Sequence, residues 1–224
     1  MKSILVIGMG RFGKLLASEF INLGDEVMIV DVNEKKINEL AHMFSDAQIA
    51  DCRNESVLRS FGIENFDMCF VTIADDFQSS LEITSLLKEL GAKTVVSLAK
   101  SDPQKKFLEK IGADEVIYLE RDFAESLAVR YSNDNIFDVI ELTDEYSIYE
   151  IPILDSWVGK SIKELDVRAK FNLNILAVKQ GGKLNPSPKA GYVFKNTDHV
   201  VVLGKEDEIF SLTSKIGSNK KKRK

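Results

Sequence analysis

A glycine-rich turn between an apolar strand and a helix is the sequence feature that most constrains this fold. The apolar run 3–7 is followed at once by Gly8-Met9-Gly10-Arg11-Phe12-Gly13, and a helix is predicted over 14–23. A second predicted strand, 27–30, leads directly into Asp31. A G-x-G-x-x-G pattern is weak evidence alone, but between a strand and a helix it has a physical mechanism. The spacing therefore predicts a βαβ unit whose turn can bind a phosphate.

Each glycine of this turn has a separate predicted role. Gly8 permits the tight turn, Gly10 lets a pyrophosphate approach the backbone, and Gly13 lets the helix pack closely on the sheet. The N–H groups and the dipole at the helix start favour an anion. Asp31 is placed to accept hydrogen bonds from both hydroxyls of an adenosine ribose, which disfavours a 2′-phosphate. We predict a nucleotide site of the Rossmann type, the alternative being a similar turn with an empty site.

Strands and helices continue to alternate as far as residue 119. Further strands are predicted over 47–50, 68–73, 94–98 and 116–119, and helices over 34–43, 55–61, 78–90 and 103–111. Such alternation implies an α/β fold with a parallel sheet covered on both faces. Six strands match the doubly wound order 3-2-1-4-5-6, in which the ligand binds where the strand order reverses.

The pattern changes beyond residue 119, which indicates a second domain. A helix over 122–131 and a polar break at 132–135 precede short strands at 147–153, 173–178 and 200–203. Helices are predicted at 160–165 and 206–216, and 181–188 as a turn followed by an extended loop. We predict a nucleotide-binding domain over 1–134, a small α+β domain over 135–219 and a disordered basic tail over 220–224. So small a second domain would gain from pairing with another copy.

The charge of the chain disfavours nucleic acid as a partner. The 224 residues have a formal net charge of -5, and the tail holds five of the 30 lysines and arginines. The rest of the chain then has 25 basic residues against 35 acidic ones, a net charge of -10. Such a surface would repel a phosphate backbone.

The sequence lacks the residue patterns of common enzymes. No tyrosine is followed four residues later by lysine, as in short-chain dehydrogenases, and there is no serine nucleophile elbow. No His/Cys/Asp cluster has zinc-site spacing, and no helix-turn-helix supports a redox-sensing repressor. Cys52 and Cys69 have no C-x-x-C spacing and read as buried thiols of a reducing cytosol. We expect no enzymatic activity.

Several further motifs occur together and in order. Asp51-Cys52 follows the third strand, VGKSIKEL lies at 158–165, PSP at 186–188, GYVF at 191–194 and DHVVVLG at 198–204. With the Arg-Phe inside the glycine motif, they resemble the RCK family (regulator of potassium conductance, also KTN or TrkA-type) of potassium transport regulatory subunits. The two-domain length is most similar to the KtrA-type subunits. The resemblance covers nearly the whole chain up to the basic tail.

The resemblance implies that ATP and ADP compete for the N-terminal site, with NAD(H) less favoured. Arg11 would reach the terminal phosphate, and a guanidinium just past the glycines does suit a multiply charged phosphate tail. Glu120 would help to hold Mg²⁺ or Ca²⁺ against the phosphates, the alternative being a plain helix N-terminal charge. The residues that match the nucleotide site are Gly8, Met9, Gly10, Arg11, Phe12, Gly13, Asp31, Val32, Asp51, Cys52, Ile73, Ala74 and Glu120.

The resemblance further implies that cyclic di-AMP binds the second domain at a symmetric dimer interface. The matching residues are Arg168, Phe171, Asn174, Ile175 and Pro188. The alternative is that Phe171, Ile175 and Pro188 only pack a small core.

The resemblance also describes an assembly. Homodimers would form an octameric ring beneath a KtrB-type potassium-translocating membrane subunit. The chain is then expected to be a cytoplasmic gating subunit, held at the inner face of the cell membrane through that subunit. The alternative function is an NAD(H)-dependent oxidoreductase or a nicotinamide redox sensor.

Overall fold

A computed structural model describes residues 1–44, 46–132, 135–143 and 145–218 of the chain. The chain divides into two compact units, Met1–Arg121 and Asp122–Lys224. The sequence-based domain boundary after residue 134 and the predicted basic tail at 220–224 both fall on residues outside this description. Within the described residues, none of the helices has the length and apolar composition needed to span a bilayer.

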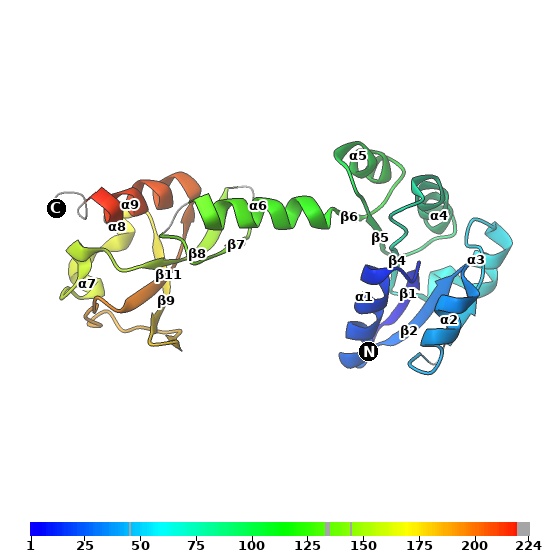
Figure 1. The fold of residues 1–224 in the computed structure, drawn as a ribbon, viewed down its shortest axis with the longest axis horizontal. Helices are drawn as coiled ribbons and strands as arrows, with labels where there is room; N and C mark the ends of the chain where they lie inside the picture. The colour runs from blue at the N-terminus through cyan, green and yellow to red at the C-terminus, as the bar shows by residue number, and fades with distance from the viewer. Residues whose placement is uncertain (45, 133–134, 144, 219–224) are drawn as a thin grey trace. The chain divides into compact units, whose positions relative to one another are not determined.

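The first unit is built on a six-stranded parallel sheet with the order β3-β2-β1-β4-β5-β6 (Figure 1). This confirms the predicted doubly wound order. Its strands are β1 (Ser3–Ile7), β2 (Glu26–Asp31), β3 (Asp46–Ile49), β4 (Met68–Val71), β5 (Val95–Leu98) and β6 (Glu115–Ile117). Its helices are α1 (Arg11–Asn22), α2 (Glu34–Leu40), α3 (Glu55–Phe61), α4 (Phe77–Glu89) and α5 (Asp102–Lys110), with a 3-10 turn at Ile63–Asn65.

The central strand β1 is buried on both faces. Leu5 and Ile7 belong to one apolar core, which includes residues of α3 and α4. Ile4 and Val6 belong to a second core, which includes residues of α1 and α2. Strands covered in this way leave a ligand little access except at their carboxyl edge.

The second unit holds a five-stranded antiparallel sheet with the order β10-β9-β11-β8-β7 (Figure 1). The strands are β7 (Asp138–Glu141), β8 (Tyr146–Pro152), β9 (Asn174–Gln180), β10 (Lys183–Asn185) and β11 (Asp198–Lys205). The helices are α7 (Ile162–Leu165), α8 (Val167–Phe171) and α9 (Glu206–Ser218), with a 3-10 turn at Asp155–Trp157. Helix α6 (Leu119–Ser132) contains the division between the units. The expected small α+β domain is confirmed.

The core of the second unit forms around Trp157. The indole is only 2% exposed, and its ring centroid lies 5.7 Å from that of Phe171 and 5.9 Å from that of Phe194. Buried residues of β8, β9, β11 and α9 complete this core. A large aromatic side chain buried this fully contributes much of the stability of a small domain.

Among the boundaries next to the predicted nucleotide site, those of α1 and β6 were wrong. Helix α1 begins at Arg11 rather than at residue 14, because the last residues of the glycine motif already form its first turn after Gly10. Strand β6 ends at Ile117, and α6 begins at Leu119. Glu120 therefore lies in the first turn of a helix and not directly after the strand.

Two strands of the second unit were missed by the sequence analysis. Strand β10 occupies part of the segment predicted as a turn and an extended loop, and β7 precedes the first predicted strand. Both lie at the edges of the sheet, and nearly all of their residues are exposed. An exposed edge strand has no buried face, so it lacks the apolar alternation from which strands are recognised.

Candidate functional site

A cavity of about 520 Å³ opens at the carboxyl edge of the parallel sheet. Segments that follow β1 to β5 line it, together with the start of α6. Its volume is typical of a site for a nucleotide-sized ligand. Eleven of the residues predicted from the sequence line it: Gly8, Gly10, Arg11, Phe12, Asp31, Val32, Asp51, Cys52, Ile73, Ala74 and Glu120.

Two predicted residues, Met9 and Gly13, are buried within the turn and do not line the cavity. Met9 is buried in the core, and its backbone N–H donates to Asp31 Oδ2 at 2.7 Å. A Cβ on Gly13 would lie 2.1 Å from the carbonyl oxygen of Gly8 and 2.4 Å from Thr72 Oγ1. The Met9 bond ties the turn to the end of β2, and a bond from Thr72 Oγ1 to the carbonyl oxygen of Gly8 at 2.6 Å ties it to the residue after β4.

The N-terminus of α1 lacks the side-chain cap that the neighbouring helices have. Gly10 occupies its N-cap position and supplies no side-chain acceptor. Helices α2 to α5 instead begin with a capping side chain, contributed by Asn33, Asn54, Asp76 and Ser101. The uncapped N–H groups of α1 belong to residues that line the cavity, such as Arg11 and Phe12. They provide donors and a favourable dipole for a phosphate.

The carboxylate of Asp31 is buried and already engaged. Besides the N–H of Met9, Oδ2 accepts from Lys36 Nζ at 2.8 Å, and Oδ1 accepts from the backbone N–H of Asn33 at 2.8 Å. A carboxylate has about four acceptor positions. Hydroxyl groups of a ribose could therefore use the remaining position or displace the Lys36 ammonium. Lys36 also lines the cavity.

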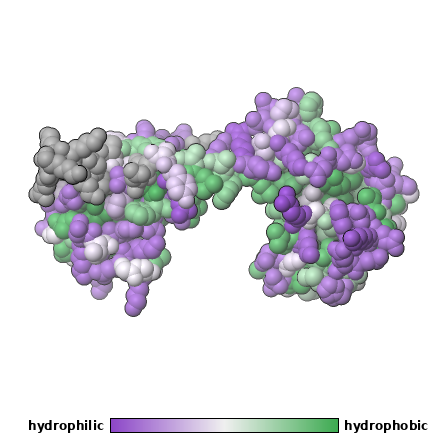
Figure 2. Space-filling view, viewed as in Figure 1, coloured by the Kyte–Doolittle hydropathy of each residue, from purple (hydrophilic) through white to green (hydrophobic). Residues whose placement is uncertain are grey.

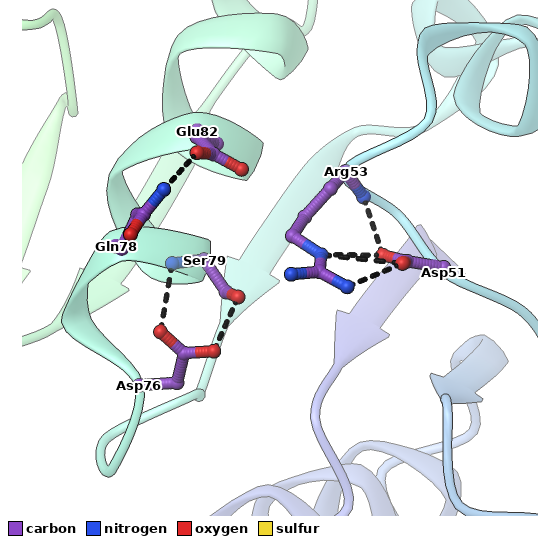
Figure 3. A network of polar contacts seen from close by, with 6 residues as sticks. All are labelled: Asp51, Arg53, Asp76, Gln78, Ser79 and Glu82. Atoms are coloured by element: carbon purple, nitrogen blue, oxygen red, sulfur yellow. Dashed lines mark hydrogen bonds and ion pairs between the residues drawn. The ribbon is translucent and has the colours of Figure 1, made fainter.

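Asp51 and Arg53 form a two-point ion pair at the end of the cavity beyond β3 (Figure 3). Arg53 Nε donates to Asp51 Oδ1 at 3.0 Å, and Nη2 donates to Oδ2 at 2.7 Å. The backbone N–H of Arg53 also donates to Oδ1 at 3.0 Å. These bonds to Arg53 hold the pKa of Asp51 below its ordinary value. Asp51 therefore stays ionised and keeps the guanidinium in place.

Cys52 lies beside this pair but has no features of a reactive thiol. It is buried, and burial first, then the charges of Asp51 and Asp31, raise its pKa to about 12. The thiol therefore stays protonated at neutral pH, and it forms no disulfide. It contributes to the cavity as a small apolar surface.

Charges of both signs surround the cavity. Four basic side chains line it, Arg11, Lys36, Arg53 and Lys100, together with five acidic ones, Asp31, Asp51, Asp75, Asp76 and Glu120. The Lys100 ion pair first, and then the charges of Arg11 and Lys36, hold the pKa of Asp75 below its ordinary value. The cavity thus has no excess of positive charge to neutralise a polyphosphate.

Sequence reasoning missed part of this lining. Thr72, Asp75, Asp76 and Lys100 lie at or just beyond the ends of β4 and β5. The rule that ligands bind at the carboxyl ends of parallel strands could have identified them. Lys36 gave no such signal, because it reaches the cavity from the first turn of α2.

A preformed metal centre does not accompany this site. Among the described residues, no group of three or more His, Cys, Asp or Glu side chains is arranged to hold a metal ion. Glu120 would contribute a single carboxylate, so bound phosphates would have to supply most of the ligands of any cation.

The five residues predicted to bind cyclic di-AMP lie in the second unit, on α8, on β9 and in the loop after β10. Arg168 is exposed, whereas Asn174, Ile175 and Pro188 are partly buried. Phe171 and Ile175 pack against the apolar core, as the packing alternative requires.

Figure 2 shows that hydrophilic residues cover much of the visible surface of each unit, with smaller apolar areas between them.

Comparisons with known proteins match both halves of the chain. Residues 4–119 match the TrkA-N domain, and residues 147–217 match the TrkA-C domain. The chain is 39% identical over 208 residues to Ktr system potassium uptake protein C of Bacillus subtilis, across 93% of this chain and 94% of the relative. The same figures apply to Ktr system potassium uptake protein A of that organism. The solved GsuK channel shares the fold, with a TM-score of 0.70 and 18% identity over 97% of this chain and 40% of the channel chain.

Proposed function

Because this chain belongs to the family in which a TrkA-N domain precedes a TrkA-C domain, we propose that it is the cytosolic regulatory subunit of a potassium uptake system. Adenine nucleotides would act as conformational effectors, with no chemical step. Such a ligand shifts a gate only by its difference in affinity for the two states. The observation that carries the proposal is the cavity that the uncapped N-terminus of α1 shares with Asp31.

In this proposal ATP and ADP bind along the carboxyl edge of the sheet. The phosphates lie at the N-terminus of α1, beside Gly8 and Gly10, and Arg11 binds the terminal phosphate of ATP. The ribose lies at Asp31, and the base lies toward Asp51 and Cys52. The strand order supports this path, because β1, β2 and β3 are consecutive neighbours.

A divalent cation would accompany ATP. The acidic residues of the cavity outnumber the basic ones, so a polyphosphate would meet uncompensated repulsion. Mg²⁺ or Ca²⁺ held between the phosphates and Glu120 would remove that repulsion.

The second unit would bind cyclic di-AMP at a two-fold interface between copies. Arg168 offers a cation for a phosphate, Asn174 an amide for an adenine edge, and Phe171, Ile175 and Pro188 apolar surfaces for the base. A two-fold symmetric ligand fits an interface that repeats the same residues on both copies. The dimers would assemble into an octameric ring on a KtrB-type membrane subunit, at the inner face of the cell membrane.

Calorimetric titration of the purified chain with ATP, ADP and NADH, with Mg²⁺ present, tests the proposal. Tight binding of ATP and ADP with weak binding of NADH is expected. Tight NADH with weak ATP would instead favour the alternative, an NAD(H)-dependent oxidoreductase or nicotinamide sensor. The carboxylate of Asp31 at the end of β2 supports this alternative as well, because it can bind the adenosine ribose of NADH as well as that of ATP.

Replacing Arg11 with alanine is expected to weaken ATP binding about 10- to 100-fold and ADP binding less than about 3-fold. Only ATP has a third phosphate for the guanidinium. Titration of each nucleotide into the variant measures the ratio. Lys14→Ala is the matched control, because Lys14 is an exposed cation one turn further along α1 that does not line the cavity. An equal loss for ATP and ADP would contradict the role given to Arg11.

Replacing Arg168 with alanine is expected to lower cyclic di-AMP affinity at least about 30-fold, because a charge-assisted bond to a phosphate is lost. ATP affinity should not change, since the two ligands bind different units. Titration with each ligand tests this, with Lys170→Ala, an exposed cation on the same helix, as the control. Loss of both ligands in Arg168→Ala would indicate misfolding instead of a lost contact.

A further inference from the structure

Arg53 presents a fixed, planar cation to the cavity, and most of its donors are unused. A guanidinium carries five N–H groups. The hydrogen bonds to Asp51 use the Nε group and one group of Nη2. Within the part of the chain that the structure describes, Nη1 makes no hydrogen bond, and Nη2 makes none beyond that to Asp51. In the view of Figure 3 the guanidinium has Asp51 on one side and, on the other, Ser79 of α4 and Asp76, the N-cap residue of that helix.

Strand order places Arg53 at one particular end of the cavity. Strand β2 lies between β1 and β3. The ends of β2 and β3 lie side by side, because Asp31 pairs with Ile49. The N–H group of Ala50 also donates to the carbonyl oxygen of Asp31 at 3.3 Å. The glycine turn follows β1, and Arg53 comes just after β3. A nucleotide with its phosphates at α1 and its ribose at Asp31 therefore extends its base toward Arg53.

The surroundings of Arg53 suit an uncharged, planar ring. Cys52, Ile73 and Ile83 line the same cavity and supply apolar surface. The bond to Asp51 first, and then the charges of Asp51, Glu82 and Asp76, raise the pKa of the guanidinium, so it stays charged. A guanidinium stacks well on an aromatic ring, and its N–H groups can donate to ring nitrogens.

We propose that Arg53 binds the base of the nucleotide and that Asp51 orients it for that contact. The class of ligand group is a purine, bound by stacking on the guanidinium plane or, edge-on, through the N–H groups that Asp51 leaves unused. This inference rests on the proposed function, because it assumes that the cavity binds a nucleotide. It assigns to Asp51 a positioning role through Arg53.

The experiment is titration of wild type, Arg53→Ala and Arg53→Lys with ATP, ADP and ribose 5-triphosphate, which has the same phosphates and no base. Arg53→Ala should lose affinity for ATP and ADP by the same factor, roughly 3- to 30-fold, and keep its affinity for ribose 5-triphosphate. Arg53→Lys should remain weakened, because lysine keeps the charge and loses the planar donor group. Asp51→Asn should also weaken ATP and ADP, by a smaller factor than Arg53→Ala.

Arg59→Ala is the matched control. Arg59 is another exposed arginine paired with a carboxylate, Glu55 on the same helix, and it does not line the cavity. Its loss changes the net charge equally, so its nucleotide affinities should equal those of wild type. Thermal unfolding of every variant checks that the fold is retained.

Three outcomes would overturn the inference. Unchanged or tighter ATP binding in Arg53→Ala would mean that the guanidinium makes no favourable contact with the base. Wild-type affinity in Arg53→Lys would mean that Arg53 contributes only its positive charge. An equal loss of affinity for ATP and ribose 5-triphosphate in Arg53→Ala would mean the same. Failure of the wild-type chain to bind any nucleotide would overturn the proposed function itself, and it is seen before any variant is made.

Discussion

Gly13→Ala lowers the free energy of unfolding of the first unit by about 3 kcal/mol or more and removes measurable ATP binding. The new Cβ would lie 2.1 Å from the carbonyl oxygen of Gly8 and 2.4 Å from Thr72 Oγ1. The carbonyl belongs to the backbone of the turn, so relief requires α1 to move away from the sheet. Chemical denaturation followed by circular dichroism measures the stability, and calorimetry measures the binding.

Gly10→Ala separates the effect of an added methyl group on ATP binding from its effect on the stability of the fold. A Cβ on Gly10 has no neighbour within 4 Å, and the Gly10 backbone is extended, a conformation that any residue adopts. Stability should change by less than about 1 kcal/mol, while ATP binding weakens because the methyl group enters the space proposed for the pyrophosphate. A stable, ATP-binding Gly13→Ala variant would show that α1 does not depend on this close approach.

Trp157→Ala lowers the free energy of unfolding of the second unit by about 3 to 5 kcal/mol, the range for removing a large buried aromatic side chain. The indole is 2% exposed and contacts both Phe171 and Phe194. Because the chain forms two compact units, ATP binding by the first unit should persist while cyclic di-AMP binding by the second is lost. Denaturation monitored by circular dichroism and titration with both ligands provide the two measurements.

Val158→Ala is the control for the loss at position 157. Val158 is the next residue in the chain and is 38% exposed, so its truncation should cost less than about 0.5 kcal/mol. Loss of ATP binding in Trp157→Ala, with Val158→Ala unaffected, would mean that the two units do not fold independently.

Residues whose position depends on the end of their own strand could be placed in the cavity from the sequence. Asp31, Asp51, Ile73 and Ala74 lie at or just beyond the ends of three strands, and all four line the cavity. In a parallel sheet such ends meet at one edge, so position along the chain is enough to bring them together. Arg53, two residues beyond Asp51, was overlooked because its pairing with Asp51 depends on side-chain conformation.

The amino-acid sequence by itself determined the order of the strands, the glycine turn and the family of the chain, because these depend on local periodicity and on motifs of fixed spacing. Only the tertiary structure decided which side chains are already engaged. It shows Lys36 on Asp31 and Arg53 on Asp51, and it places Glu120 in the first turn of α6. It also shows the edge strands β7 and β10. Both ion pairs join residues at most five positions apart, so they depend on the conformation of the loop and of the side chains. Edge pairing depends on which segments fold side by side, and hydrophobic periodicity encodes neither kind of contact.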